Sequence, residues 1–401
     1  MFKFVLGLGL FGLLTSTIYA GMVVTGAFAY LRSRRKNKLN PDYTPPVSLL
    51  KPLHGMEPNL EAHLESFFEQ DYPCYEILFC ARQADDKGLL MAQRVAARHP
   101  NIPVRFLTTG EPRYINAKVH SLERMQVAAS HDIFIISDSD VRVTPNYIRE
   151  VVAPFEEEKV GAVTCPYRGV AAGEGLWAML EAVGMSIEMT SGVLVARMLE
   201  GMQFTLGPTM AARRECVERM GGFSLLGSYC ADDFVLGNAI YEQGRTVILS
   251  DHVIDHMVIN MSFMDSIRHQ VRWMKSTRFS RPKGHFGTSL TFSVPFGILA
   301  TVGAAGLGSP ELAAVLLGFS VGTRILMGLI VGGGVLEDPD LLRTTLLYPL
   351  RDAMGFGFWA ASYLSNKVVW RGEVYALAPG GLMRSLSNKA ESKRTEPALT
   401  A

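Results

Sequence analysis

The most constraining feature of this sequence is a long apolar stretch at its beginning. Residues 4–31 contain no charged side chain, and at about 1.5 Å per residue such a helix exceeds the ~30 Å hydrocarbon core of a bilayer. Only Lys3 precedes the stretch, whereas five basic residues follow it: Arg32, Arg34, Arg35, Lys36 and Lys38. A cleaved signal peptide has the opposite order of charges. The pattern predicts an uncleaved anchor, residues 1–31, with an outward-facing N-terminus, and a basic juxtamembrane linker, residues 32–46, in the cytoplasm.

Three more apolar stretches lie near the other end, at residues 289–307, 312–334 and 341–364. The first two are expected to form a helical hairpin. The second contains Arg324 and the third contains Arg351 and Asp352, and ionisable groups inside a bilayer are costly unless they pair or face a polar cavity. Residues 285–370 are therefore expected to hold two or three membrane helices, with the third stretch spanning, re-entrant or interfacial. A polar tail, residues 371–401, follows and is expected to be disordered from Arg384 onward.

The composition agrees with a membrane protein, because hydrophobic residues make up 48% of the chain and charged residues only 19%. Lys and Arg number 39 against 38 Asp and Glu, and the net charge of +1 gives no electrostatic reason to expect a nucleic-acid partner. The five cysteines are scattered without the spacing of a disulfide framework or a zinc site, which indicates a reducing compartment.

The polar middle of the chain alternates between apolar runs of strand length and helical patterns. The expected strands are residues 47–50, 76–80, 104–107, 133–137, 162–165 and 246–249, and the expected helices are 60–70, 87–99, 117–129 and 147–156. This alternation predicts an α/β domain with a mostly parallel sheet of the nucleotide-binding type. The sequence has no glycine-rich loop of the Walker or Rossmann form, so other groups must hold any phosphates.

The strand at residues 133–137 leads into Asp138-Ser139-Asp140, two carboxylates one residue apart. Parallel sheets bind their ligands at the carboxyl ends of the strands. Oxygen ligands at this spacing suit Mg²⁺ or Mn²⁺, which in turn binds a diphosphate. The ordinary alternative is a polar turn that closes the strand.

Polar residues after other elements are further candidates. Asp85-Asp86 follow the second strand, where a carboxylate can accept from a ribose hydroxyl or a uracil N–H. Asn116 and Lys118 open a helix, where an amide and an ammonium suit the phosphates of a donor. A solvated loop and a solvated helix start explain these residues as well.

Asp232-Asp233 begin a helix that follows the turn Gly221-Gly222-Phe223. Adjacent carboxylates raise each other's pKa towards the range in which a general base works at neutral pH. Capping of the helix N-terminus is the alternative role.

Residues 263–283 predict an amphipathic helix suited to the surface of an anionic bilayer. Its apolar stripe contains Phe263, Ile267, Val271 and Met274, and its basic stripe contains Arg268, Arg272 and Lys275. Arg272 can bind a diphosphate bidentately and Trp273 can exclude water beside it, although both also fit a plain interfacial anchor. The Met-rich stretch at residues 178–202 fits a buried core helix better than a surface for an apolar ligand.

Together these motifs resemble the ceramide glucosyltransferases of glycosyltransferase family 21 and their bacterial relatives associated with hopanoid biosynthesis. The resemblance covers nearly the whole chain. It is carried by residues 47–53, Gly55, Pro58-Asn59-Leu60, Phe67-Phe68-Glu69-Gln70-Asp71-Tyr72-Pro73, Tyr75-Glu76 and the ordered acids. The family's three aspartates fall on Asp86, Asp138 and Asp233, and its terminal basic motif ends at Arg272-Trp273.

The resemblance implies a GT-A fold, a Rossmann-like mostly parallel sheet, within a cytoplasmic catalytic domain at residues 47–260, with an interfacial helix at residues 261–284 and transmembrane helices at both ends. It implies inverting transfer of one hexose from UDP-glucose or UDP-N-acetylglucosamine to the hydroxyl of a membrane lipid, with ceramide the first choice. An integral protein of the bacterial inner membrane is expected. The residues and the resemblance together predict donor binding by Asp86, Asn116, Lys118, Asp138 and His269, and ligation of Mg²⁺ or Mn²⁺ by Asp138 and Asp140. They predict Asp233 as the catalytic base, with Arg272 and Trp273 as the other catalytic residues.

Two positions depart from the family pattern. The terminal motif begins with Gln or Arg in the family, where this chain has His269. The ceramide enzymes lack an acid at the position of Asp140, whose presence favours dependence on a divalent metal. The open alternatives are a hopanoid (bacteriohopanetetrol) N-acetylglucosaminyltransferase, a family 2 processive polysaccharide synthase, which usually has more spans, and an inactive membrane scaffold, which has no reason to keep the acids.

Overall fold

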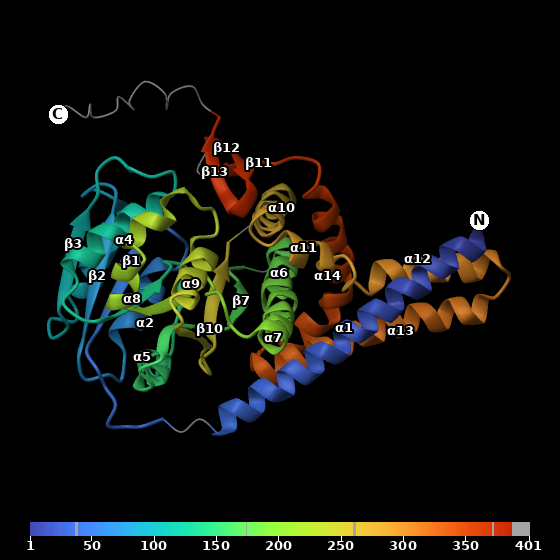
Figure 1. Ribbon diagram of the computed structural model, residues 1–401, viewed down its shortest axis with the longest axis horizontal. Coiled ribbons are helices and arrows are strands. Elements are labelled where there is room, and N and C mark those ends of the chain that lie inside the picture. The colour runs from blue at the N-terminus through green and yellow to red at the C-terminus, as the bar shows by residue number, and fades with distance from the viewer. Residues whose placement is uncertain (37–38, 174, 260–261, 371–372, 387–401) are drawn as a thin grey trace.

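The computed structural model describes residues 1–36, 39–173, 175–259, 262–370 and 373–386. An α/β domain lies at one end of the molecule and a bundle of long helices at the other (Figure 1). The domain is built on a seven-stranded sheet in the order β3-β2-β1-β4-β8-β6-β9. These strands are β1 (Val47–Pro52), β2 (Tyr75–Ala81), β3 (Val104–Thr108), β4 (Ile133–Ser137), β6 (Val160–Thr164), β8 (Thr209–Arg213) and β9 (Thr246–Leu249).

Four neighbouring strands, β3, β2, β1 and β4, run parallel, and the helices that connect them are those expected from the sequence. The helices of the domain are α2 (Leu60–Phe68), α3 (Lys87–Ala96), α4 (Ala117–Ala128), α5 (Tyr147–Val152), α8 (Arg214–Arg219) and α9 (Asp232–Glu242). Strands β2, β4 and β6 are buried at every residue, which is why they are continuous apolar runs without alternation. All six predicted strands and all four predicted helices are confirmed.

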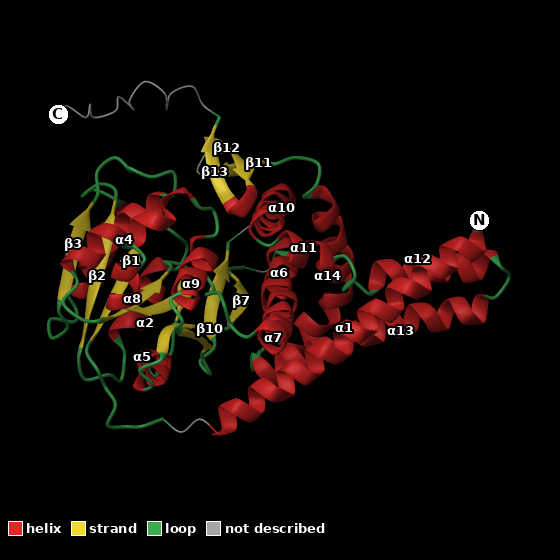
Figure 2. Ribbon diagram, in the orientation of Figure 1, coloured by secondary structure: helices red, strands yellow, loops and turns green. Residues whose placement is uncertain are grey.

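One central strand departs from the sequence prediction. β8 is antiparallel to both β4 and β6, between which it lies. Its sequence, Thr-Met-Ala-Ala-Arg, lacks the β-branched or aromatic run that marks the other strands. The sheet is therefore mostly, and not entirely, parallel (Figure 2).

A second sheet of three strands brings distant segments of the chain to the end of β4. It contains β5 (Val141–Arg142), β10 (Ile254–Val258) and β7 (Tyr167–Ala171), with β10 in the middle. The pairing of His256 with Val141 sets β10 beside the turn that carries Asp138 and Asp140. No sequence pattern predicted this sheet, because its strands are short and only partly apolar.

The N-terminal stretch forms one helix, α1 (Phe2–Lys36), that extends away from the α/β domain and packs on α12 (Val294–Gly306) and α13 (Pro310–Gly328). These three helices form the long arm in Figure 1. Three helices in the described part of the chain are long and apolar enough to cross a membrane: Phe2–Lys36, Leu176–Glu200 and Pro310–Val335. The predicted hairpin of α12 and α13 is confirmed, although α12 is shorter than the stretch expected there. Lys38 of the basic cluster lies outside the described residues.

The helix at residues 176–200 comprises α6 (Leu176–Val183), a π-helical turn (Gly184–Glu188) and α7 (Met189–Glu200). In its most apolar stretch of 18 residues, 78% is buried inside the protein, compared with 22% of the corresponding stretch of α1. It packs against α14 (Leu341–Ala361), α1 and α10 (Phe263–Ser280), which agrees with the predicted core helix.

The buried charged residues of the C-terminal helices are paired. In the bundle Arg324 Nε lies 2.8 Å from Asp352 Oδ1, and Arg351 Nη2 lies 2.9 Å from Glu188 Oε2. Asp352 Oδ2 also accepts from the backbone N–H groups of Ser293 and Val294, at the start of α12. These contacts compensate the cost of burying charge in an apolar bundle.

We expect Asp352→Asn to lower the free energy of unfolding by about 3–5 kcal/mol, because it leaves Arg324 buried without its counter-ion while keeping an amide oxygen for the α12 backbone. The double variant Arg324→Met/Asp352→Asn should recover much of that loss. Denaturant unfolding in lipid nanodiscs measures both, with the exposed Glu311→Gln as the control. Equal losses in the single and double variants would show that the ion pair does not hold the bundle.

The C-terminal segment differs from the expected tail. Residues 367–385 contain a three-stranded antiparallel sheet, β11 (Lys367–Trp370), β12 (Glu373–Ala378) and β13 (Leu382–Ser385). The sheet packs against α10, which α11 (Pro282–Thr288) follows (Figure 1). Val368, Tyr375, Leu377 and Met383 bury a small cluster of their own. Alternation of apolar and polar residues over strands of only four to six residues is a weak pattern, so the sequence did not predict this sheet. Residues 387–401, most of the tail expected to be disordered, lie outside the described residues.

Candidate active site

Asp138 and Asp140 lie at the carboxyl end of β4, and each contacts a basic side chain from another element. Lys118 Nζ lies 2.7 Å from Asp138 Oδ1, and His256 Nε2 lies 3.0 Å from Asp140 Oδ2. Burial opposes the charged form of His256, but Asp140 outweighs it, and the pKa of the imidazole is raised. The second oxygen of Asp140, Oδ1, is buried and has no hydrogen-bond partner within the protein.

Lys51, to which the sequence assigned no role, contacts the turn that carries Asp138 and Asp140. It is fully buried near the end of β1, with its ammonium 3.5 Å from the Phe67 ring centroid. Its Nζ donates to the backbone oxygen of Asp138 at 2.8 Å. Burial lowers the pKa of Lys51 to about 7, against the opposing effect of Asp138 and Asp140. A lysine inside an otherwise apolar buried strand is the sequence signal that identifies it.

Asp232 and Asp233 occupy the first turn of α9, where the helix dipole favours negative charge. Asp233 Oδ2 accepts from the N–H of Gly207 at 2.8 Å, and Oδ1 accepts from the N–H of Phe234 at 2.8 Å. Each oxygen keeps a second lone pair. Lys118 Nζ lies 3.6 Å from Asp232 Oδ2, so the same ammonium that contacts Asp138 links β4 to the start of α9.

Asp233 is the acid of the site whose pKa best suits a general base near neutral pH. Burial, followed by the charge of Asp232, raises its pKa to about 6, and the N–H groups of Phe234 and Gly207 limit the rise. For Lys118, burial opposes the charged form, but Asp138 and Asp232 outweigh it and hold the ammonium pKa above its usual range. The site therefore contains one ammonium group that stays charged, Lys118, and one carboxyl group that titrates close to pH 6, Asp233.

Asn116 caps α4 and fixes its position relative to the loop before α9. Its side-chain oxygen accepts from the N–H of Lys118 at 3.2 Å, and its amide nitrogen donates to the backbone oxygen of Tyr229 at 3.3 Å. Asn116 is almost fully buried. These contacts place Lys118 between Asp138 and Asp232, so the predicted pair of donor-binding residues lies at the site with Asn116 in a supporting position.

Asp86 lies at the start of α3, after β2, and its carboxylate already binds three backbone N–H groups. Oδ1 accepts from Gly88 and Leu89, and Oδ2 accepts from Gly55 at 2.9 Å. Gly55 has φ of +70°, a backbone conformation that favours glycine. Asp86 therefore shapes the loop between β1 and α2, and lies apart from the other acids because β1 separates β2 from β4.

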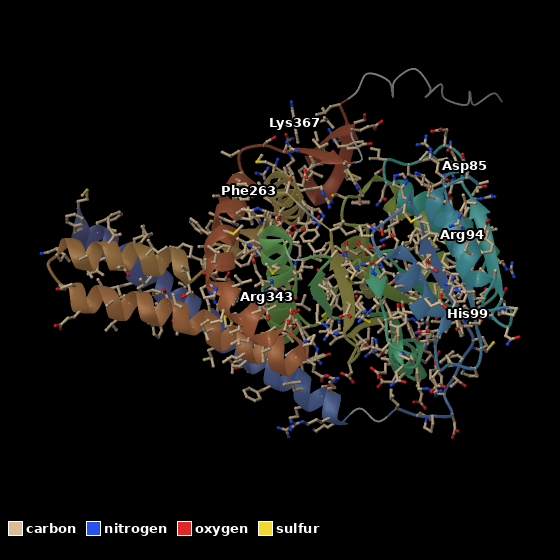
Figure 3. All side chains as sticks on the ribbon, turned by 180° about the vertical axis from the view of Figure 1, so that it is seen from behind. Asp85, Arg94, His99, Phe263, Arg343 and Lys367 are labelled. Carbon is tan, nitrogen blue, oxygen red and sulfur yellow. The ribbon has the colours of Figure 1, made fainter. Side chains whose placement is uncertain are left out.

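The terminal basic motif lies on α10, whose bounds confirm the predicted helix. The guanidinium of Arg272 lies 5.8 Å from the Trp370 ring centroid, on β11. Trp370 and Cys230 pack against the same small cluster, which places Arg272 beside the loop that leads to Asp232 and Asp233. Burial raises the pKa of the Cys230 thiol, and the nearby charge of Arg272 partly opposes that rise. In Figure 3, Phe263 marks the start of α10 and Lys367 the start of β11, on the same side of the molecule.

The face of α10 that is buried inside the protein is polar, and the predicted apolar stripe is exposed or half-buried. Ser266, Gln270 and Ser276 are buried, whereas Phe263 is 42% exposed and Met264 51% exposed. His269 Nδ1 lies 2.6 Å from Oε1 of the buried Glu181, and its ring centroid is 4.3 Å from that of Trp273. The helix packs against α6, α14 and the three-stranded sheet. A position at the bilayer surface stays a prediction.

The structure thus brings together Lys118, Asp138, Asp140, Asp232 and Asp233, with Arg272 next to their loop. Asp86 lies apart from them at the end of β2, and His269 contacts Glu181 and Trp273. Among the described residues no group of three or more His, Cys, Asp or Glu side chains is arranged to hold a metal by itself.

Comparisons with known proteins identify the family and the fold. Ceramide glucosyltransferase 1 of Caenorhabditis elegans is 26% identical over 369 residues, which cover 90% of this chain and 78% of that protein. The ceramide glucosyltransferase of Komagataella phaffii is 34% identical over 115 residues, 28% of this chain and 23% of that protein.

The mannosyltransferase PcManGT from Pyrobaculum calidifontis, solved with GDP-Man and Mn²⁺, superposes with a TM-score of 0.53 at 19% identity, over 87% of this chain and 98% of that one. The predicted GT-A fold is confirmed by this likeness. The model of the family described as glycosyl transferase family 21 matches residues 12–383, nearly the whole chain. The chain therefore belongs to glycosyl transferase family 21 and is a sugar-transferring enzyme.

Proposed function

We propose that this enzyme transfers a single glucose from UDP-glucose to the primary hydroxyl of ceramide, with inversion at the anomeric carbon. The observation that carries the chemistry is the cluster in which Lys118 joins Asp138, at the end of β4, to Asp232 and Asp233, at the start of α9. The acceptor is a lipid, which agrees with the long apolar helices that pack beside the catalytic domain and with the ceramide glucosyltransferases among the relatives.

The donor lies along the carboxyl edge of the parallel strands. Asp86 and the loop that it holds accept the nucleoside at the end of β2, and Lys118 faces the diphosphate at the end of β4. Arg272 binds the diphosphate from the side of α10 and stabilises the charge that develops on the leaving UDP. Trp273, and His269 at the first position of the motif, line the donor site on the same side as Arg272.

The residues present fit a divalent metal ion. Asp140 Oδ1 is a buried carboxylate oxygen without a hydrogen-bond partner, and Asp138 lies two residues before it at the same turn. These two side chains would hold Mg²⁺ or Mn²⁺, with His256 orienting Asp140 from behind. A bound metal supplies positive charge for the diphosphate. PcManGT, which shares the fold, was solved with Mn²⁺.

Asp233 acts as the general base. Its carboxylate is fixed by the N–H groups of Gly207 and Phe234 and keeps lone pairs to accept the proton of the acceptor hydroxyl. As that proton moves to Asp233, the oxygen attacks the anomeric carbon from the face opposite UDP, one C–O bond forms, and the bond to the diphosphate breaks.

The catalytic domain lies in the cytoplasm of a bacterial cell, where UDP-sugars are made.

No observation favours the hopanoid or polymer-forming alternatives, because the relatives that cover most of the chain are ceramide glucosyltransferases. The test is turnover by protein in nanodiscs, with UDP-glucose and UDP-N-acetylglucosamine each offered against ceramide and bacteriohopanetetrol. Mass spectrometry of the lipids should show one hexose on ceramide. Transfer only to bacteriohopanetetrol, or only of N-acetylglucosamine, would replace the proposed substrate pair.

The pKa of Asp233 predicts the pH dependence of the reaction. Because the base must be ionised, kcat/KM should rise with pH through about 6 and then level off. Asp232→Asn removes the neighbouring charge that helps to raise this pKa, so the acid limb should move to lower pH. Initial rates measured over a pH series give the acid limb of the parent and of the variant. An acid limb that does not move in the variant would assign it to another group.

A further inference from the structure

Glu181 is a buried acid that the proposed mechanism does not use. It lies on α6, whose sequence Leu-Trp-Ala-Met-Leu-Glu-Ala-Val is otherwise apolar, and only 1% of its surface is exposed. Burying a carboxylate is costly unless it is paired and hydrogen-bonded. Both oxygens have such partners: Oε1 lies 2.6 Å from His269 Nδ1, and Oε2 accepts from Ser266 Oγ at 2.7 Å.

These partners belong to the face of α10 that carries the terminal motif. Ser266 lies three residues before His269 and four before Gln270, and Trp273 lies four and three residues after them, so the four side chains share one face of the helix. Gln270 Nε2 donates to Ser266 Oγ at 2.9 Å, and the His269 ring lies against Trp273. Glu181 is the acidic end of this network and connects α6 to the motif.

We propose that Glu181 is a positioning residue for His269. Its carboxylate accepts the Nδ1 hydrogen, which fixes the orientation of the ring and sets Nε2 on the opposite side of the imidazole, at the first position of the Arg-Trp motif. This inference rests on the proposed function, in which that motif binds the diphosphate of the donor.

The chemistry explains why a partner is needed at this position. Gln and Arg, which the family has here, carry N–H donors in every protonation state, whereas a neutral imidazole has one donor and one acceptor. A buried carboxylate on Nδ1 selects which nitrogen carries the proton. The histidine at this position is thus matched by a buried acid on its Nδ1.

A double-mutant cycle tests the inference with UDP-glucose and ceramide. Glu181→Gln should lower kcat/KM for the donor by about 10- to 100-fold, as expected for the loss of a residue that orients a binding group. His269→Gln restores the residue found in the family and should stay active. In that background Glu181→Gln should have little further effect, because its action passes through the histidine. Equal losses in both backgrounds would show a purely structural role and overturn the inference.

Ser266→Ala is the matched control, because it removes the other hydrogen bond to Glu181 and leaves His269 in place. Its kcat/KM should stay close to that of the parent. A loss as large as that of Glu181→Gln would show that the packing of the whole network, and not the orientation of His269, sets the activity, and would overturn the inference.

A second readout does not depend on the acceptor. The ¹⁵N shifts of labelled histidine, assigned to His269 with His269→Gln, should show a protonated Nδ1 that loses its proton preference in Glu181→Gln. An unprotonated Nδ1 in the parent would overturn the inference even if ceramide is glucosylated. A protonated Nδ1 in a protein that transfers no sugar to any lipid would instead refute the proposed function alone.

Discussion

Replacement of Asp233 by Asn is expected to remove nearly all sugar transfer, with kcat lower by about 10²- to 10⁴-fold, the usual contribution of a general base. An amide cannot accept the proton of the acceptor hydroxyl at neutral pH. Its oxygen can still accept one of the two backbone N–H groups that Asp233 binds, so the start of α9 should keep its geometry.

The diagnostic feature of this variant is the separation of catalysis from binding. Asp233 has no recorded contact with Asp86, and Lys118 keeps its ion pair with Asp138, so the affinity for UDP, measured by titration calorimetry, should change little. Asp132→Asn, on a side chain that is 95% exposed, is the control and should leave kcat unchanged. Near-normal turnover by Asp233→Asn would mean that another group takes the proton.

The second large effect concerns the divalent metal. Removal of metal by a chelator should abolish transfer, and Mg²⁺ or Mn²⁺ should restore it. Asp140→Asn should lower activity at a fixed metal concentration by about 10²-fold or more and raise the metal concentration needed for half-maximal activity, because stabilisation of diphosphate charge by a metal is worth several kcal/mol.

His256→Gln provides a graded comparison for that variant. The imidazole contacts Asp140 Oδ2 and not the proposed ligand oxygen Oδ1, so its loss should cost about 10- to 100-fold. Full activity in the presence of a chelator would contradict metal dependence. In that case Lys118 and Arg272 would be the cations that bind the diphosphate.

The sequence predicts the α/β layers well because β1, β2, β4 and β6 are short apolar runs that can only be buried strands. It predicts the acids of the site for a related reason, since Asp138 and Asp233 end or begin clearly marked elements. It does not predict β8, whose residues have no strong strand preference, or the sheet that carries His256.

The partners of the acids depend on tertiary contacts that local pattern does not record. Lys118 lies 20 residues before Asp138, yet its ammonium reaches both Asp138 and Asp232, and this follows only once α4 is placed by Asn116. The role of Glu181 is hidden in the same way, because a single acid in an apolar helix gains its meaning only from α10 packed against it. The pairing of Arg324 with Asp352 likewise joins two helices, and explains charges that the sequence alone left as a problem.

The central claim is transfer of one sugar, with inversion, to a lipid hydroxyl. The most direct measurement is the structure of the lipid product formed from UDP-glucose, which carries an α-linked sugar, and ceramide by the protein in nanodiscs. Mass spectrometry counts the hexoses and proton NMR of the isolated glycolipid gives the anomeric configuration. A single β-linked glucose on ceramide is the expected result. An α-linked product would contradict direct displacement assisted by Asp233, and a chain of several sugars would contradict single transfer.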